Sequence, residues 1–134
     1  MPLTKSIITL PMLPPSLNAY RLMHWCKQHK LKKQWAHEVF VEWHRMNRPK
    51  FQRVRITLVF TFPDRRRRDL DNYMATGSKF VGDAVKGLFI PDDIPKYLTG
   101  WTFLFERGTL PQTTIIIEKA DRSQCSGLSC TGGS

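Results

Sequence analysis

The sequence has 134 residues, of which 41% are hydrophobic, so it is long enough for one domain with a single hydrophobic core and too short for several domains. It carries 21 Lys and Arg against 11 Asp and Glu, and this net charge of +10 indicates a polyanionic partner, nucleic acid first among them. No stretch approaches the roughly 20 apolar residues of a membrane-spanning helix, and the first 13 residues lack the pattern of a signal peptide, so we expect a cytoplasmic protein that binds no membrane.

The first part of the chain predicts a strand, a loop and a long helix. Residues Lys5–Leu10 have the pattern of a strand, and Pro14–Asn18 predicts a rigid loop because two prolines fix the backbone and remove two donors. Residues Tyr20–Lys27 form a basic connection without a clear period. From Gln28 to Met46 apolar residues recur at steps of three and four, which predicts an amphipathic helix that ends before Pro49.

The second part of the chain predicts a strand, a second helix and two further strands. Every second residue of Val54–Phe62 is a large apolar side chain, which is typical of a strand with one buried face. A second helix is expected from about residues 74–78 to Lys86. Two further strands, Tyr97–Glu106 and Thr113–Lys119, are separated by a turn at Gly108–Pro111, so we expect them to pair as a hairpin.

The element order β-α-β-α-β-β predicts an α+β fold in a single domain, a mixed β-sheet with helices packed on it. Residues 1–120 would form this domain, and the Ser- and Gly-rich residues 121–134 are expected to be a disordered tail. The periodicity of the two helices assigns eight side chains to the core: Trp35, Val39, Phe40, Trp43, Phe80, Val81, Ala84 and Val85.

The cysteines and histidines do not predict a site of their own. Cys26, Cys125 and Cys130 are odd in number and lack paired spacing, which indicates a reducing compartment and free thiols rather than disulfides or zinc. His37 and His44 fall on the polar face of the first helix, where we expect solvated side chains.

The aromatic residues Tyr20 and Trp25 lie among basic residues and outside any regular period. The basic residues around them are Arg21, Lys27, Lys30, Lys32 and Lys33. Aromatic rings among positive charges are typical of segments that stack on bases and hold phosphates, so the segment is either a DNA contact or a simple connector.

The strongest chemical signal follows the alternating strand, in the run Arg65-Arg66-Arg67-Arg68-Asp69-Leu70-Asp71-Asn72. Asp69 and Asp71 are two residues apart, and in extended backbone such residues point to the same side, so both carboxylates can reach one point. Two negative charges about 4 Å apart repel by roughly 4 kcal/mol at an effective dielectric near 20, so holding them together needs a cation. Hard oxygen ligands without a nearby His or Cys favour Mg²⁺, for which Mn²⁺ can substitute.

A third carboxylate has to come from another segment. Asp92 and Asp93 in an exposed loop are the natural donors, and Asp83 on the second helix is another option. In the alternative, structural interpretation, Asp69 and Asp71 only form surface salt bridges with the neighbouring arginines.

The four arginines favour the chemical interpretation, because guanidinium groups bind phosphate in a bidentate manner. A metal held between the carboxylates and a phosphodiester would activate water and stabilise the leaving oxygen. Lys79, about two helical turns after Asp71, would add positive charge to the transition state, or is an ordinary exposed lysine.

Four motifs together resemble the RusA family of Holliday junction resolvases over residues 5–119. They are Pro14-Pro15-Ser16-x-Asn18, the arginine-rich block at 65–72, Lys79-x-x-x-Asp83 and Pro91-Asp92-Asp93. The resemblance implies that Asp69, Asp71 and Asp93 are catalytic metal ligands, with Asp92 as the alternative third ligand, and that Lys79 is the catalytic lysine. It also implies DNA contacts from Pro14, Pro15, Ser16, Asn18, Arg65, Arg66, Arg67 and Arg68.

The family also implies a homodimer, Mg²⁺ and paired nicks at four-way junctions, in a bacterial or phage-infected cell. One departure is the spacing from Asp71 to Lys79, which exceeds the bacterial pattern by about one helical turn and includes Gly77. This spacing resembles phage-type members, in which a later helix start would keep the lysine in place.

We therefore expect a Mg²⁺-dependent, structure-selective endodeoxyribonuclease that resolves branched DNA by phosphodiester hydrolysis. One alternative is a nuclease that uses the same site on flaps or replication forks. The other is a catalytically inert protein that binds DNA through its basic surface.

Overall fold

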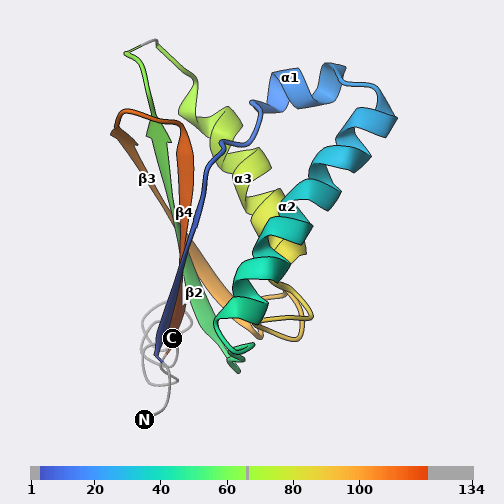
Figure 1. The fold of residues 1–134 in the computed structure, drawn as a ribbon, viewed down its shortest axis with the longest axis vertical. Helices are drawn as coiled ribbons and strands as arrows, with labels where there is room; N and C mark the ends of the chain where they lie inside the picture. Colours follow the sequence, from blue (N-terminus) through green and yellow to red (C-terminus); the bar gives the residue numbers. More distant parts are fainter. Residues whose placement is uncertain (1–3, 66, 121–134) are drawn as a thin grey trace, which may run out of the picture.

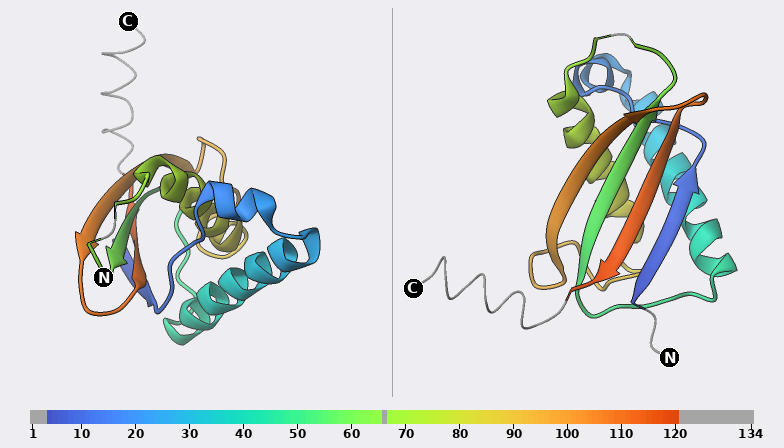
Figure 2. Two further views of the ribbon diagram at one scale, coloured as in Figure 1. Left: turned by 90° about the horizontal axis from the view of Figure 1, so that it is seen from above. Right: turned by 90° about the vertical axis from the view of Figure 1, so that its left-hand side faces the viewer.

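In the computed structural model, which describes residues 4–65 and 67–120, one four-stranded sheet carries three helices on one side (Figures 1 and 2). The strands are β1 (Lys5–Leu10), β2 (Val54–Phe62), β3 (Leu98–Arg107) and β4 (Gln112–Lys119). The helices are α1 (Leu17–Leu22), α2 (Trp25–Arg45) and α3 (Leu70–Val85). The predicted α+β class with a mixed sheet is confirmed.

The strand order β1-β4-β2-β3 places β2 in the interior of the sheet, antiparallel to β4 and parallel to β3. The predicted hairpin of the last two strands is therefore wrong, because β2 lies between them. The connection between β3 and β4 crosses the end of β2, where the Gly108 amide donates to the Phe62 carbonyl oxygen at 3.1 Å. Four residues can span this gap, since two strand spacings amount to about 10 Å.

The inward face of β2 forms the centre of the core. Ile56, Leu58 and Phe60 are each fully buried, and the β4 residues Ile115 and Ile117 pair beside them. This is the burial that the two-residue alternation of β2 predicts, because a central strand with one covered face removes every second side chain from water.

The two long helices, α2 and α3, cover the buried face of the sheet. The predicted core residues are confirmed with one exception. Trp35 of α2 lies 5.6 Å from Phe80 of α3 between ring centroids, and both are almost fully buried. The exception is Phe40, which is 47% exposed. It lies off the stripe of Val39 and Trp43 and stacks on His44 at the helix surface instead.

The helix starts differ from those predicted. Ser16, expected in a loop, caps the short helix α1 by accepting a hydrogen bond from the Ala19 amide at 3.2 Å. α2 begins at Trp25, so the connection between the first two helices is only two residues long. α3 begins at Leu70 rather than at residues 74–78, because Asp69 acts as its N-cap.

Within the part of the chain that the structure describes, no helix has both the length and the apolar character that crossing a bilayer requires. The predicted tail at 121–134, with Cys125 and Cys130, and the side chain of Arg66 lie outside the described residues.

Gly77 sets how closely α3 approaches the sheet. A Cβ atom at this position would lie 2.5 Å from Cζ of Phe60 and 3.4 Å from a methyl group of Leu58. A glycine inside a helix disfavours the helix by about 1 kcal/mol, so its presence here is explained by the close contact with β2 rather than by helix formation.

We predict that Gly77→Ala destabilises the protein by about 1–2 kcal/mol, because overpacking against Phe60 outweighs the gain in helix propensity. Urea unfolding would measure the change, with Ser78→Ala as the control on the adjacent position. In a Phe60→Leu background the effect of Gly77→Ala should shrink. An equal or stabilising effect in both backgrounds would contradict the close contact.

Candidate functional site

The candidate site lies where the parallel strands β2 and β3 end and α3 begins (Figure 1). Phe62 and Arg107 pair at the ends of the two strands, and the chain then passes through residues 63–69 into α3. A shallow hollow of about 410 Å³ opens here, and its charged lining residues are Asp64, Arg65, Arg68, Glu106 and Arg107. The topology therefore gathers both acidic and basic side chains at one end of the sheet.

Asp69 and Asp71 occupy the N-terminus of α3, in a different geometry from the one predicted. Only Asp69 has extended backbone, with φ −83° and ψ 102°, whereas Asp71 lies in the first helical turn. Asp69 Oδ1 accepts from the Asp71 amide and Oδ2 accepts from Asn72 Nδ2, both at 3.2 Å. The positive end of the helix dipole favours both negative charges, so the two carboxylates can lie near each other without a cation.

The two carboxylates remain accessible to a ligand. Both residues are exposed, each Asp69 oxygen accepts one hydrogen bond, and the Asp71 carboxylate accepts none from the described residues. The alternative in which they pair with the arginine run is not seen among those residues, where Arg68 pairs with Asp64 instead. Exposed carboxylate oxygens with free lone pairs fit a hard cation such as Mg²⁺.

The loop that follows α3 and contains Asp92 and Asp93 lies at the C-terminal end of this helix (Figure 1). Asp93 Oδ2 is 3.4 Å from the position that a Cβ on Gly82 would occupy. Gly82 is twelve residues after Leu70, which corresponds to about 18 Å along the helix. One chain therefore does not bring Asp93 to Asp69 and Asp71, and no group of three His, Cys, Asp or Glu residues that could hold a metal occurs within the described ranges.

The other two acidic residues of this loop and helix have local partners. Asp92 Oδ1 accepts from the Asp93 amide at 2.8 Å. Asp83 forms an ion pair with Lys86 at 3.5 Å, at the C-terminal end of α3. Neither of them approaches the N-terminus of the helix, so none of the three residues expected to give the third carboxylate, Asp83, Asp92 and Asp93, reaches Asp69 and Asp71 within one chain.

Lys79 is exposed on α3, eight residues and about 12 Å along the axis from Asp71. Its Nζ lies 5.4 Å from the ring centroid of Tyr20 in α1. The expectation that a later helix start compensates for the longer spacing is wrong, because α3 begins at Leu70. Asp71 and Lys79 lie in one continuous helix, so their separation is fixed by the helical rise.

The predicted DNA-contacting loop Pro14–Asn18 is attached to the same helix. Thr76 Oγ1 donates to the Pro15 carbonyl oxygen at 2.6 Å. Pro14 is buried and Ser16 caps α1, whereas Asn18 is exposed. The loop therefore lies beside α3 between the levels of Asp71 and Lys79.

The arginines of the run differ from one another. Arg65 and Arg67 are exposed, and Arg66 lies outside the described residues. The Arg68 side chain is only 11% exposed, bonds Asp64 at 2.9 Å and stacks 4.4 Å from the centroid of the Phe62 ring. Arg68 therefore fastens its segment to the end of β2, and of the described members of the run Arg65 and Arg67 face solvent.

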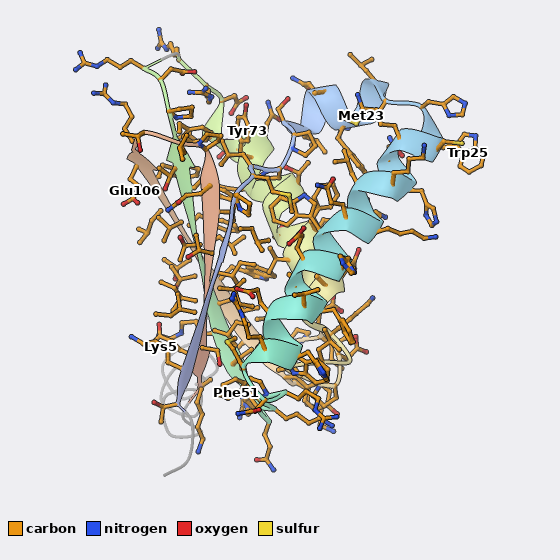
Figure 3. The ribbon with its side chains drawn as sticks, in the orientation of Figure 1. Lys5, Met23, Trp25, Phe51, Tyr73 and Glu106 are labelled. Carbon is orange, nitrogen blue, oxygen red and sulfur yellow. The ribbon has the colours of Figure 1, made fainter. Side chains whose placement is uncertain are left out.

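The sequence did not point to Glu106 and Arg107, which are exposed at the end of β3 beside the arginine run. Thr61 Oγ1 donates to Glu106 Oε1 at 3.2 Å and holds it against β2. Figure 3 labels Glu106 and Tyr73 at this end of the molecule. Only the parallel pairing of β2 and β3 brings these residues to the site, and no local pattern predicts that pairing.

No protein-family model matches this sequence, and no curated protein matches it. Function must therefore be inferred from the chemistry of the residues themselves.

We predict that Asp69→Ala lowers the free energy of unfolding by about 1 kcal/mol through loss of the helix cap, whereas Asp69→Asn retains most of it because Asn caps equally well. Thermal or urea unfolding would measure both. Asp83→Ala, on the same helix but away from its start, serves as the control and should change stability by less than about 0.5 kcal/mol. Equal losses for the Ala and Asn variants at position 69 would contradict the capping role.

Proposed function

We propose that the protein is a metal-dependent endodeoxyribonuclease that acts on branched DNA, as the resemblance to the RusA resolvases implies. One observation carries the proposal: Asp69 and Asp71 lie exposed beside exposed arginines, and in the described residues they form no ion pair with them. Both sets of charges thus stay available, carboxylates for a cation and guanidinium groups for phosphates. If these aspartates and arginines had only a structural role, we would expect their charged groups to pair with one another.

In this proposal each group has its own task. Arg65, Arg67 and Arg107 hold the phosphodiester backbone through charge-assisted hydrogen bonds. Asp69 and Asp71 bind Mg²⁺, which when bound lowers the pKa of a coordinated water and stabilises charge on the leaving oxygen. Lys79 and the Pro14–Asn18 loop extend the DNA-contacting surface along the exposed side of α3.

A homodimer would complete the site. Within one chain Asp93 is about 18 Å along α3 from the carboxylate pair, so in this proposal Asp93 of a second copy supplies the third ligand. Two copies related by a two-fold axis would form two such sites, because each copy then gives its pair to one site and its Asp93 to the other. Two sites in one dimer explain how so small a chain would cut two strands of a junction.

A second candidate is a catalytically inert DNA-binding protein. It is favoured by the observation that Asp69 already has a structural role as the cap of α3. In this case the basic surface is retained without hydrolysis. Cleavage assays separate the two candidates.

We predict that the protein cleaves synthetic four-way DNA in Mg²⁺ and not in EDTA, and that Asp71→Asn lowers cleavage by on the order of 100-fold or more, the scale of losing one charge-stabilising group. Flap, fork and linear substrates in the same assay would measure the selectivity. Glu118→Gln, at an exposed carboxylate of β4 away from α3, is the control and should cleave normally. Cleavage in EDTA or by Asp71→Asn would contradict the metal site, and tight binding without cleavage would favour the inert protein.

We predict that mixing two inactive variants, Asp71→Asn and Asp93→Asn, restores about a quarter of the wild-type nicking, because half of the dimers are then mixed and each mixed dimer has one intact site. A mixture of Asp69→Asn with Asp71→Asn should stay inactive. Each site takes both of these aspartates from the same copy, so in a mixed dimer each site has lost one of them. Nicking of a labelled four-way junction after subunit exchange would measure the recovery. Without recovery in the first mixture, a site shared between two copies would be excluded.

A further inference from the structure

The corner between α1 and α2 exposes two large apolar side chains that are three residues apart in the chain. Leu22 is 88% exposed and Trp25 is 69% exposed. Trp25 lies beside His24, with ring centroids 5.6 Å apart, and Figure 3 shows it pointing away from the sheet. Exposed apolar side chains of this size that occur together indicate a contact surface.

The surroundings of the two side chains are strongly basic. The basic residues that flank them are Arg21, Lys27, Lys30, Lys32 and Lys33, and the first acidic residue of the whole sequence is Glu38. None of these five forms an ion pair with any residue that the structure describes. An apolar protein partner would not require this charge, whereas a polyanion with flat apolar groups matches both features.

The corner is fixed to the core rather than loosely attached. Tyr20, in the last turn of α1, is buried and packs edge-on against Phe80 at 5.3 Å. Gln28 Nε2 donates to the Tyr20 carbonyl oxygen at 2.7 Å and thereby joins α1 to α2. Burial of Tyr20 thus leaves Leu22 and Trp25 on the outer side of a rigid turn.

The corner is also connected to the candidate site. The Tyr20 ring that anchors it contacts Lys79 of α3, and the segment preceding α1 is held by Thr76. In Figure 1, α1 and the start of α2 lie at the same end of the molecule as the 63–69 segment. A DNA molecule that contacts the candidate site can therefore reach the corner as well.

We propose that the residues Arg21–Lys33 form a wedge for branched DNA, which we call the basic wedge. Trp25 and Leu22 stack on unpaired bases where two DNA arms separate, and the lysines hold the flanking phosphates. In an intact duplex the base faces are already stacked on one another, so these side chains gain a partner only at a branch, an end or a single strand. The basic wedge thus selects branched over linear DNA for the nuclease proposed above, on which this inference rests for its substrate.

The basic wedge is tested by measuring DNA binding under conditions in which no cleavage occurs. The probe is a forked DNA with 2-aminopurine at the branch, in EDTA, with the matching linear duplex as the comparison. We expect Trp25→Ala to weaken fork binding about tenfold and to remove the fluorescence change of 2-aminopurine, with duplex binding within about twofold of wild type. Phe40→Ala, which removes another exposed aromatic ring from α2, is the matched control and should leave both unchanged.

The phosphate contacts are tested separately. Lys27→Ala and Lys30→Ala should each reduce the slope of log affinity against log salt by about 0.7–0.9. Fork binding and 2-aminopurine fluorescence of Trp25→Ala equal to wild type would overturn the proposal, as would equal losses on fork and duplex. Conversion of a wild-type dimer to monomers by Trp25→Ala would also overturn it, since the corner would then serve self-association. Failure of the nuclease would appear only in the cleavage assay, because none of these readouts requires metal.

Discussion

The contact between α3 and β2 is the constraint on which the rest of the molecule depends. Gly77 lets the helix approach Phe60 more closely than any other residue would allow, and this fixes the position of α3 along the strand. Because α3 starts with its own cap at Asp69, the same contact places the exposed carboxylates at the end of β2. One packing contact in the core thus positions charged groups on the surface.

Helix packing explains how the remaining functional segments reach that surface. Phe80 of α3 contacts both Trp35 of α2 and Tyr20 of α1, so a single ring connects the three helices. Thr76 adds a polar contact to Pro15. The Tyr20 ring that packs on Phe80 also lies 5.4 Å from Lys79 Nζ, so this exposed lysine is supported by a buried neighbour, which reduces the conformational entropy that a ligand would have to remove.

Local patterns predicted much of the fold and part of the site. The alternation in Val54–Phe62 and the three- and four-residue steps in α2 are properties of single elements, so they could be read without knowing their neighbours. The spacing of Asp69 and Asp71 singles out this pair but predicts extended backbone for both, whereas Asp69 caps α3 and Asp71 lies in its first turn. The parallel pairing of β2 with β3, the presence of Arg107 at the site and the distance of Asp93 depend on contacts between remote segments, which no local period encodes.

The length of α3 has a consequence for symmetry. In the proposed dimer each copy contributes the start of its α3 to one site and the loop beyond its end to the other, so the two helices must run antiparallel. The two-fold axis then passes level with the middle of the helix, near residue 76, and the two sites face opposite ends of the helix pair. The length of α3 thus sets the distance between the two sites in such an assembly. Each helical turn added or removed would change this distance by about 5.4 Å.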